Sequence, residues 1–204
     1  RPDIIVTQTQ CEVCAVRLSE VEAAVSEWLG TKPQIVALAP NSLEDIWKDI
    51  DRTAQALHAT AKGKGLVSSL KASFSSIQEQ TRSLIHRTVA CIEWIDPLMA
   101  AGNWVPTLVE CAGGVNLFGT AGQHSPWMQW ESLVESDPDI IILMPCGFDI
   151  PRTIEEAKRL IEKPAWNELK AVRGRQVFVV DGNQYFNRPG PRIADSLEIL
   201  AELF

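Results

Sequence analysis

Short, continuously apolar segments recur along the chain, and each has the length of a strand. They lie at 3–8, 34–39, 88–92, 139–144 and 176–180. Continuous rather than alternating apolar runs are typical of strands that are covered on both faces, as in a parallel sheet. The pattern therefore predicts buried strands at these five places.

Segments with apolar residues at helical spacing lie between these runs. We expect helices at 18–29, 43–58, 66–84, 104–112, 130–136, 154–161, 166–172 and 191–204. Ser42 and Asp45 fit a capping box at the start of the second helix, and a break is expected at 62–65, ahead of the third. Strands that alternate with helices imply right-handed βαβ units and the α/β fold class.

The long helix expected near 64–84 follows another helix without a strand between them. Such a helix is a reasonable connector between two lobes with mostly parallel sheets. We therefore expect an incomplete N-terminal lobe at 1–61, a bridging helix at 62–86 and a C-terminal lobe at 87–204. The first lobe would hold only two strands, which suggests that preceding sequence is missing. A single sheet with a helical hairpin on one face is the alternative.

Charge and hydrophobicity exclude some classes of function. The 204 residues carry a formal net charge of −7 and no basic stripe, which argues against nucleic acid as the main partner. The longest apolar run, at 140–144, is far shorter than the roughly 20 residues that span a bilayer. The chain opens on a predicted strand without a signal peptide, so its compartment cannot be read from its start.

Polar and aromatic residues follow the predicted strands where each one ends, which is where open α/β sheets bind ligands. Aromatic faces together with amide side chains suit a pocket that stacks on a flat ligand and hydrogen-bonds its rim. Taken singly, each residue has a structural alternative, such as core packing for Trp94. The ligand-binding residues that we expect are Gln8, Gln10, Cys11, Cys14, Glu93, Trp94, Trp104, Cys146, Phe148, Asn183, Gln184, Tyr185, Phe186, Asn187 and Arg188.

Cys11 and Cys14 form a C-x-x-C pair, which can line a pocket, form a reversible disulfide or hold a metal. A structural zinc site needs four ligands, and the sequence has no second pair of this kind. Cys146 is the further thiol that could join a metal site. Pocket lining or a reversible disulfide is favoured over a metal site, and catalysis is less favoured still.

Sequence motifs of known catalytic chemistry are absent. No G-x-S-x-G elbow, Walker loop, G-x-G-x-x-G or H-E-x-x-H occurs. His58 and His86 lie at the ends of helical segments, whereas His124 lies in a loop with Trp127 that could line a ligand site. We therefore expect no catalytic residues, and a binding protein rather than an enzyme.

Several stretches, in this order, resemble class III periplasmic substrate-binding proteins of ABC importers. They are 42–46, 104–109 with 112–116, 132–133 with 137–142, 166–177, and 188–192 with 197–200, and their order along the chain makes the resemblance cover nearly all of it. The resemblance implies two lobes joined by a rigid helix, a ligand in the cleft between them, and a partner permease. It implies a periplasmic or cell-surface location, although the chain itself leaves a cytoplasmic one open. It also implies that the chain begins within the first lobe.

The combination of Cys11 and Cys14, Glu93-Trp94, Asn103-Trp104 and 183–187 is most similar to a branch labelled cobalamin-binding. A corrin is broad, partly apolar and fringed with amides, which suits tryptophan faces with Asn and Gln side chains. An anionic ferric siderophore would attract a cluster of basic residues, and only Arg188 stands near the predicted site. Cobalamin (vitamin B12) or a related macrocycle is therefore the expected ligand. The alternatives are iron-siderophore or haem binding, a cysteine-centred metal or redox protein, and a cytoplasmic sensor on the same fold.

Overall fold

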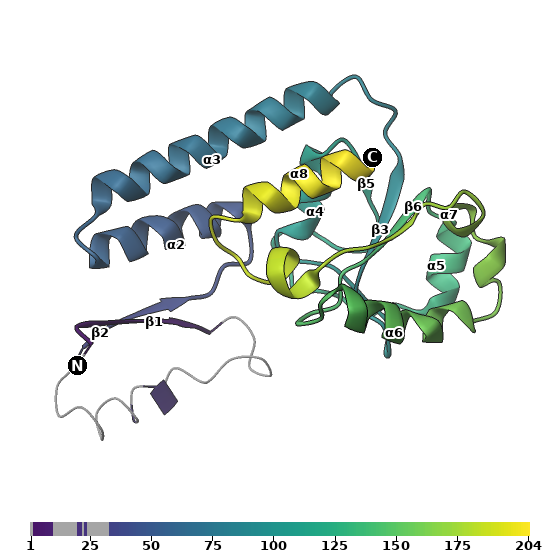
Figure 1. Cartoon of the computed structure of the whole chain (residues 1–204), viewed down its shortest axis with the longest axis horizontal. Helices are drawn as coiled ribbons and strands as arrows, with labels where there is room; N and C mark the ends of the chain where they lie inside the picture. The colour runs from purple at the N-terminus through teal and green to yellow at the C-terminus, as the bar shows by residue number, and fades with distance from the viewer. Residues whose placement is uncertain (1, 10–19, 22, 24–32) are drawn as a thin grey trace. The chain divides into compact units, whose positions relative to one another are not determined.

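The computed structural model describes residues 2–9, 20, 21, 23 and 33–204. Most of the helix expected at 18–29, together with Gln10, Cys11 and Cys14, lies outside the described residues. The chain divides into two compact units, unit 1 from Arg1 to Lys71 and unit 2 from Ala72 to Phe204 (Figure 1). The boundary between the units falls inside one long helix.

Unit 1 contains a two-stranded parallel sheet and a helix that packs on it. The strands are β1 (Ile4–Gln8) and β2 (Gln34–Leu38), and the helix is α2 (Leu43–Ala56). The Ser42 side chain accepts a hydrogen bond from the backbone N–H of Asp45, and the Asp45 carboxylate accepts one from the backbone N–H of Ser42. The predicted capping box is thus confirmed.

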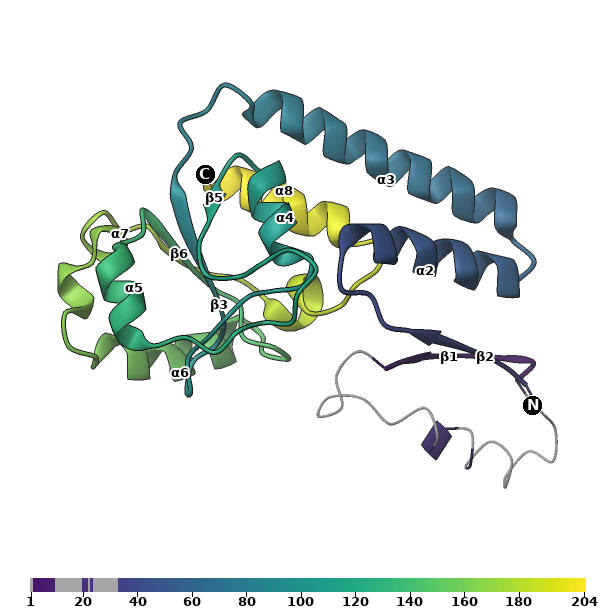
Figure 2. The same cartoon turned by 180° about the vertical axis from the view of Figure 1, so that it is seen from behind.

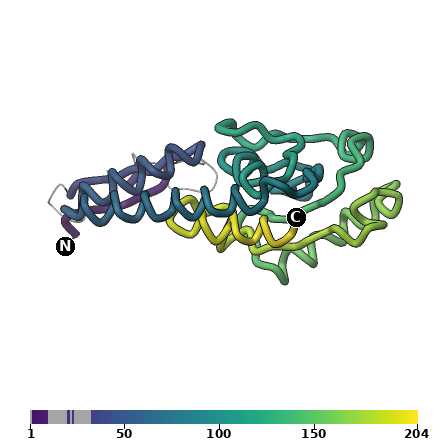
Figure 3. The backbone as a smooth tube through the Cα atoms, turned by 90° about the horizontal axis from the view of Figure 1, so that it is seen from above, coloured from purple at the N-terminus to yellow at the C-terminus, as the bar shows by residue number. Residues whose placement is uncertain are grey.

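The break expected at 62–65 is wrong, because helix α3 (Thr60–Thr81) runs straight through it. The chain turns earlier, at His58, which has a φ of +53°. A Cβ at Gly63 would lie 2.4 Å from the Ala54 Cβ. Glycine therefore lets α3 pack closely on α2 here, and the first half of α3 lies beside α2 in Figure 3. The glycine-containing segment 62–65 predicts a helix break, whereas in the structure Gly63 marks a close contact between two helices.

Unit 2 is built on a mostly parallel sheet with the path β4-β3-β6-β7. Strands β3 (Thr88–Trp94), β6 (Ile140–Leu143) and β7 (Val177–Val179) are parallel, whereas β4 (Met99–Ala100) is antiparallel to β3. A short strand, β5 (Val115–Asn116), pairs with the start of β3. Every strand expected from an apolar run is confirmed. The two-residue strands β4 and β5 are too short to produce such a run.

Helices cover both faces of this sheet, as Figures 1 and 2 show from opposite sides. One face carries α5 (Trp130–Ser136), α6 (Ile150–Ile161), the 3-10 turn η1 (Trp166–Glu168) and α7 (Lys170–Arg173). The other carries α4 (Val105–Cys111) and α8 (Ile193–Leu203). A π-helical turn, η2 (Gly182–Phe186), follows β7. The expected α/β class is confirmed.

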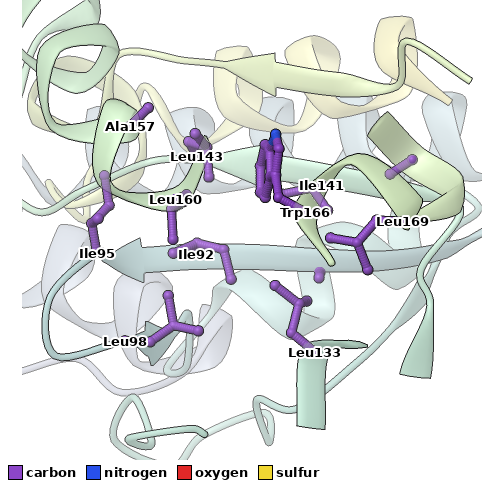
Figure 4. Packing of buried hydrophobic residues seen from close by; sticks show 12 residues of the cluster. Ile92, Ile95, Leu98, Leu133, Ile141, Leu143, Ala157, Leu160, Trp166 and Leu169 are labelled. Carbon is purple, nitrogen blue, oxygen red and sulfur yellow. The ribbon is translucent and has the colours of Figure 1, made fainter. Parts of the chain in front are cut away.

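The core of unit 2 explains why its strands are apolar throughout. Ile92, Ile141 and Leu143 from the sheet pack against Leu160 and Trp166 (Figure 4). Successive strand residues point to opposite faces, and both faces are covered. Each fully buried aliphatic side chain contributes about 1.5–3 kcal/mol to folding. This core fixes where the strands end, and so where the loops that follow them lie.

Candidate functional site

The loops that follow β3, β6 and β7 are joined to one another at the carboxyl ends of the strands. The Cys146 backbone N–H donates to the Glu93 carbonyl at 3.0 Å, and the Asn183 N–H donates to the Phe148 carbonyl at 3.0 Å. A Cβ at Gly182 would lie 2.3 Å from the Pro145 carbonyl oxygen, so glycine is required for this close approach. The three loops thus form one continuous surface of unit 2.

Two aromatic rings from different loops meet on this surface. The centroids of Trp94 and Phe148 are 5.2 Å apart with the rings tilted by 51°, and both residues are half-buried. The Arg152 guanidinium lies 5.2 Å from the centroid of the Phe148 ring. A cavity of about 230 Å³ adjoins the pair, and it is lined by Trp94, Ile95, Asp96, Phe148, Arg152, Glu156 and Arg159.

The charges around this cavity balance. Glu156 forms ion pairs with both Arg152 and Arg159, and Arg159 also lies 3.5 Å from the Asp96 carboxylate. The expectation that Arg188 alone stands near the site is therefore wrong. Helix α6 begins at Ile150, four residues before the predicted start at 154, and its first turns bring Arg152 to the Phe148 ring. The two guanidiniums are neutralised by two carboxylates.

Strand pairing extends the aromatic surface beyond Trp94. Trp94 pairs with Met99 in β4, and Met99 in turn forms an antiparallel bridge with Trp127. The register of β3 and β4 shifts between Ile92 and Trp94. The backbone pairing places Trp94, Met99 and Trp127 next to one another on three adjacent segments, and we call these three residues the row. Trp127 is 64% exposed. The sequence indicates the loop of His124 and Trp127 as one that could line a ligand site, but neither Met99 nor Trp127 is among the expected ligand-binding residues, because the Met99–Trp127 pairing joins segments that are far apart along the chain.

Trp127 ends a loop, residues 119–127, which we call the Trp127 loop. Its Ser125 hydroxyl donates to the Glu93 carboxylate at 2.8 Å and accepts from the Gly102 N–H at 3.1 Å. Burial raises the pKa of Glu93, while the hydrogen bonds from Ser125 and Gly102 and the nearby His124 oppose that shift. The predicted site residue Glu93 thus lies where the loop meets the end of β3.

The loop after β7 supplies polar groups. Arg188 donates to the backbone and side-chain oxygens of Asn183, each at 2.9 Å. Gln184 donates to the Tyr185 hydroxyl at 3.1 Å, and the Arg192 guanidinium lies 5.8 Å from the centroid of the Tyr185 ring. Gln184 and Arg188 are exposed, whereas Asn183 and Tyr185 are half-buried. The structure therefore brings these residues together in one ordered turn.

The remaining predicted residues differ in burial and in position. Trp104 is 4% exposed and Phe186 is fully buried, so neither ring offers a face to a ligand in this structure. Gln8 ends β1 in unit 1. Asn187 follows η2 and is half-buried. Cys146 is half-buried in the loop after β6, and the described residues contain no group of three or more His, Cys, Asp or Glu side chains that could hold a metal ion.

The fold is the α/β fold of two-lobed binding proteins, and the comparisons give the family of the chain. The sequence model described as "Periplasmic binding protein" matches residues 1–183, so the chain belongs to that family. A curated relative from Bacillus subtilis (strain 168), "Uncharacterized ABC transporter substrate-binding lipoprotein YvrC", is 26% identical over 166 residues. The match covers 79% of this chain but only 50% of the relative. Helices in the described part of the chain are too short or too polar to cross a membrane.

Three solved structures share the fold. A possible iron-binding (periplasmic solute-binding) protein from Staphylococcus epidermidis has a TM-score of 0.78 at 22% identity, covering 99% of this chain and 76% of its own. The haem-binding protein RhuT from Roseiflexus sp. RS-1 has a TM-score of 0.75 at 20% identity, and the match covers 99% of this chain and 75% of RhuT. The vitamin B12 binding protein BtuF of Vibrio cholerae has a TM-score of 0.66 at 21% identity, covering 98% and 73%.

Proposed function

We propose that this protein is the substrate-binding component of an ABC importer, a carrier of ligand rather than an enzyme. Its membership of the periplasmic binding protein family supports this role, as does its likeness to a relative named as an ABC transporter substrate-binding lipoprotein. Its partners would then be a small-molecule ligand and an ABC permease. Its place would be outside the cytoplasm, in the periplasm or at the cell surface.

We further propose that the ligand is a broad, flat macrocycle of the corrinoid type, such as cobalamin. The observation that carries this proposal is the row of Trp94, Met99 and Trp127, with Phe148 packed beside Trp94. Aromatic and thioether side chains provide wide apolar contact with a planar ligand. Asn183 and Gln184 would hydrogen-bond an amide-fringed rim. The cavity of about 230 Å³ is too small for a whole macrocycle, so it would take one edge or substituent.

The charge balance around the cavity favours a ligand with little net charge. Arg152 and Arg159 are each paired with Glu156, so an anionic ligand would have to compete with a carboxylate that is already in place. Haem or a ferric siderophore is the second candidate, because both guanidiniums are more than half exposed and could exchange partners. Solved structures of the same fold include a haem-binding and a possible iron-binding protein.

Calorimetric titration of the intact protein with cyanocobalamin, haem and a ferric hydroxamate tests these proposals. We expect saturable binding of cyanocobalamin in the micromolar range or tighter, and weaker binding of haem and of the ferric hydroxamate. Tight binding of haem or of the hydroxamate, without binding of cyanocobalamin, would favour the second candidate, a haem or ferric siderophore ligand. If none of the three binds, the proposal of this ligand class is contradicted.

A further inference from the structure

Glu93 connects two parts of the candidate site through different atoms. Its backbone carbonyl accepts a hydrogen bond from Cys146 in the loop after β6. Its carboxylate accepts the Ser125 hydroxyl of the Trp127 loop at 2.8 Å. The next residue along the chain is Trp94, which belongs to the row of Trp94, Met99 and Trp127. Glu93 thus contacts two loops of the surface, and its neighbour in the chain is Trp94, whose ring packs against Phe148.

The Trp127 loop lies closely against the segment that follows β3. The Gly122 N–H donates to the Asn103 carbonyl at 2.8 Å, and the Ala100 N–H donates to the Pro126 carbonyl at 3.0 Å. A Cβ at Gly102 would lie 2.6 Å from the Ser125 backbone nitrogen. Small changes at Ser125 are therefore transmitted to the backbone that carries Trp127, two residues further along.

The carboxylate at this place is costly for folding. Glu93 is shielded enough that burial raises its pKa, and no Lys or Arg forms an ion pair with it among residues that the structure describes. A partly buried carboxylate without a Lys or Arg partner is costly, although the hydrogen bonds from Ser125 and Gly102 and the nearby His124 favour its charged form. The hydrogen bond from Ser125 gives this carboxylate a defined partner in the Trp127 loop.

We propose that Glu93 is a positioning residue that acts through Ser125 to fix the Trp127 loop, and so sets how Trp127 is presented to the ligand. This inference rests on the proposed function for the ligand, but its effect on the loop does not require ligand. Glu93 is half-buried and contacts the loop through Ser125, which is 4% exposed, whereas Trp127 is 64% exposed.

Hydrogen exchange of the ligand-free protein tests the first half of the proposal. Glu93→Ala removes the acceptor of the Ser125 hydroxyl, and Ser125→Ala removes that donor together with the acceptor of the Gly102 N–H. In both variants we expect exchange of the Gly122 and Ala100 amides to accelerate about fivefold. Glu93→Gln keeps an oxygen that can accept from Ser125, so exchange should stay near that of the wild type. Thr81→Val is the matched control, because it removes a buried hydroxyl that contacts Cys111 rather than the loop. Unchanged loop exchange in Ser125→Ala and Glu93→Ala overturns the proposal.

A double-mutant cycle with cyanocobalamin tests the second half. Glu93→Ala should raise the Kd about fivefold in the wild-type background and leave it unchanged in a Trp127→Ala background. An equal loss of cyanocobalamin affinity in the wild-type and Trp127→Ala backgrounds would mean that Glu93 does not act through Trp127, and would overturn the proposal. If Glu93→Ala does not fold, Ser125→Ala carries the same prediction. If the wild type binds no corrinoid, the proposed ligand fails while the exchange result still decides whether Glu93 fixes the loop.

Discussion

At the scale of single residues, Glu156 determines the charge of the aromatic cavity. Its two carboxylate oxygens each contact a different guanidinium, those of Arg152 and Arg159. Asp96 balances the second of these from the loop after β3. The cavity is thereby suited to an uncharged group, and the removal of one carboxylate would leave a net positive site beside Phe148.

We expect Glu156→Gln to raise the affinity for haem, which carries two propionates, by about twofold to fivefold. The affinity for cyanocobalamin should change little. Glu155→Gln is the control, because Glu155 is the neighbouring residue and pairs with exposed Lys158. Calorimetric titration of both variants measures the effect. A similar gain in haem affinity for both would show that the change in overall charge, not the cavity, is responsible.

Asp139 gives a prediction about pH and stability. The hydrogen bond from Lys170, followed by that from the Thr88 backbone, lowers the pKa of Asp139 from 3.8 to about 2. A carboxyl whose pKa is lowered on folding stabilises the protein above its unfolded-state value, and this stability is lost as the pH falls from about 4 to about 2.

Asp139→Asn should therefore reduce the free energy of unfolding at pH 7 by on the order of 1–2 kcal/mol, after allowance for solvent screening. The difference from the wild type should shrink as the pH falls through this range. Urea unfolding at a series of pH values measures it, with the exposed Glu135→Gln as a control. If the difference in free energy of unfolding between the wild type and Asp139→Asn is constant with pH, the charge of Asp139 does not contribute to stability.

Single site residues could be predicted from the sequence only in part. Trp94 ends β3, Phe148 lies in the loop after β6, and Asn183 and Arg188 lie in the segment after β7. The rule that ligands bind at strand ends is the reason that we expect them at the site. Met99 and Trp127 join the surface through a long-range bridge that leaves no local pattern. Burial of Trp104 and Phe186 depends on the packing of α4 and η2, which residue type alone does not reveal.

At the scale of elements, glycine position is informative in α3. Gly63 and Gly65 are two residues apart in the same helix, but only Gly63 faces α2, where a Cβ would clash with Ala54. A Cβ at Gly65 would meet nothing within 4 Å. The pair was read from sequence as a helix break, because helix propensity alone does not distinguish a close packing contact from a stop.

Gly63→Ala should lower the free energy of unfolding by about 1–3 kcal/mol, because α2 and α3 must separate to fit the methyl group. Gly65→Ala should instead raise it by about 0.5–1 kcal/mol, since alanine favours the helix and has open space. Urea unfolding of the two variants makes the comparison. Equal effects would contradict the assignment of Gly63 as a packing contact.

The strands were the elements most fully predictable. Continuous apolar runs gave β1, β2, β3, β6 and β7 to within two residues at each end, because strands covered on both faces have no polar side. The segment at 166–172 was predicted as one helix, and the structure divides it at Leu169 into η1 and α7. Helix periodicity does not distinguish a 3-10 turn followed by a short helix from one continuous helix.

At the scale of the whole molecule, the order of motifs along the chain indicated the family, and the match over residues 1–183 confirms it. The family match does not identify the ligand. Structures of the same fold come from proteins named for iron, haem and vitamin B12. The choice among these ligands therefore rests on the aromatic row and its charge surroundings rather than on the fold.

The most direct test of this account is the affinity of cyanocobalamin for the wild type, Trp94→Ala and Trp127→Ala. Trp130→Phe is the control, because Trp130 stacks on Trp166 at α5 and lies outside the row. We predict that each alanine variant weakens binding about tenfold or more, while the control binds like the wild type. Wild-type affinity in both alanine variants would contradict the claim that a flat ligand lies on the row of Trp94, Met99 and Trp127.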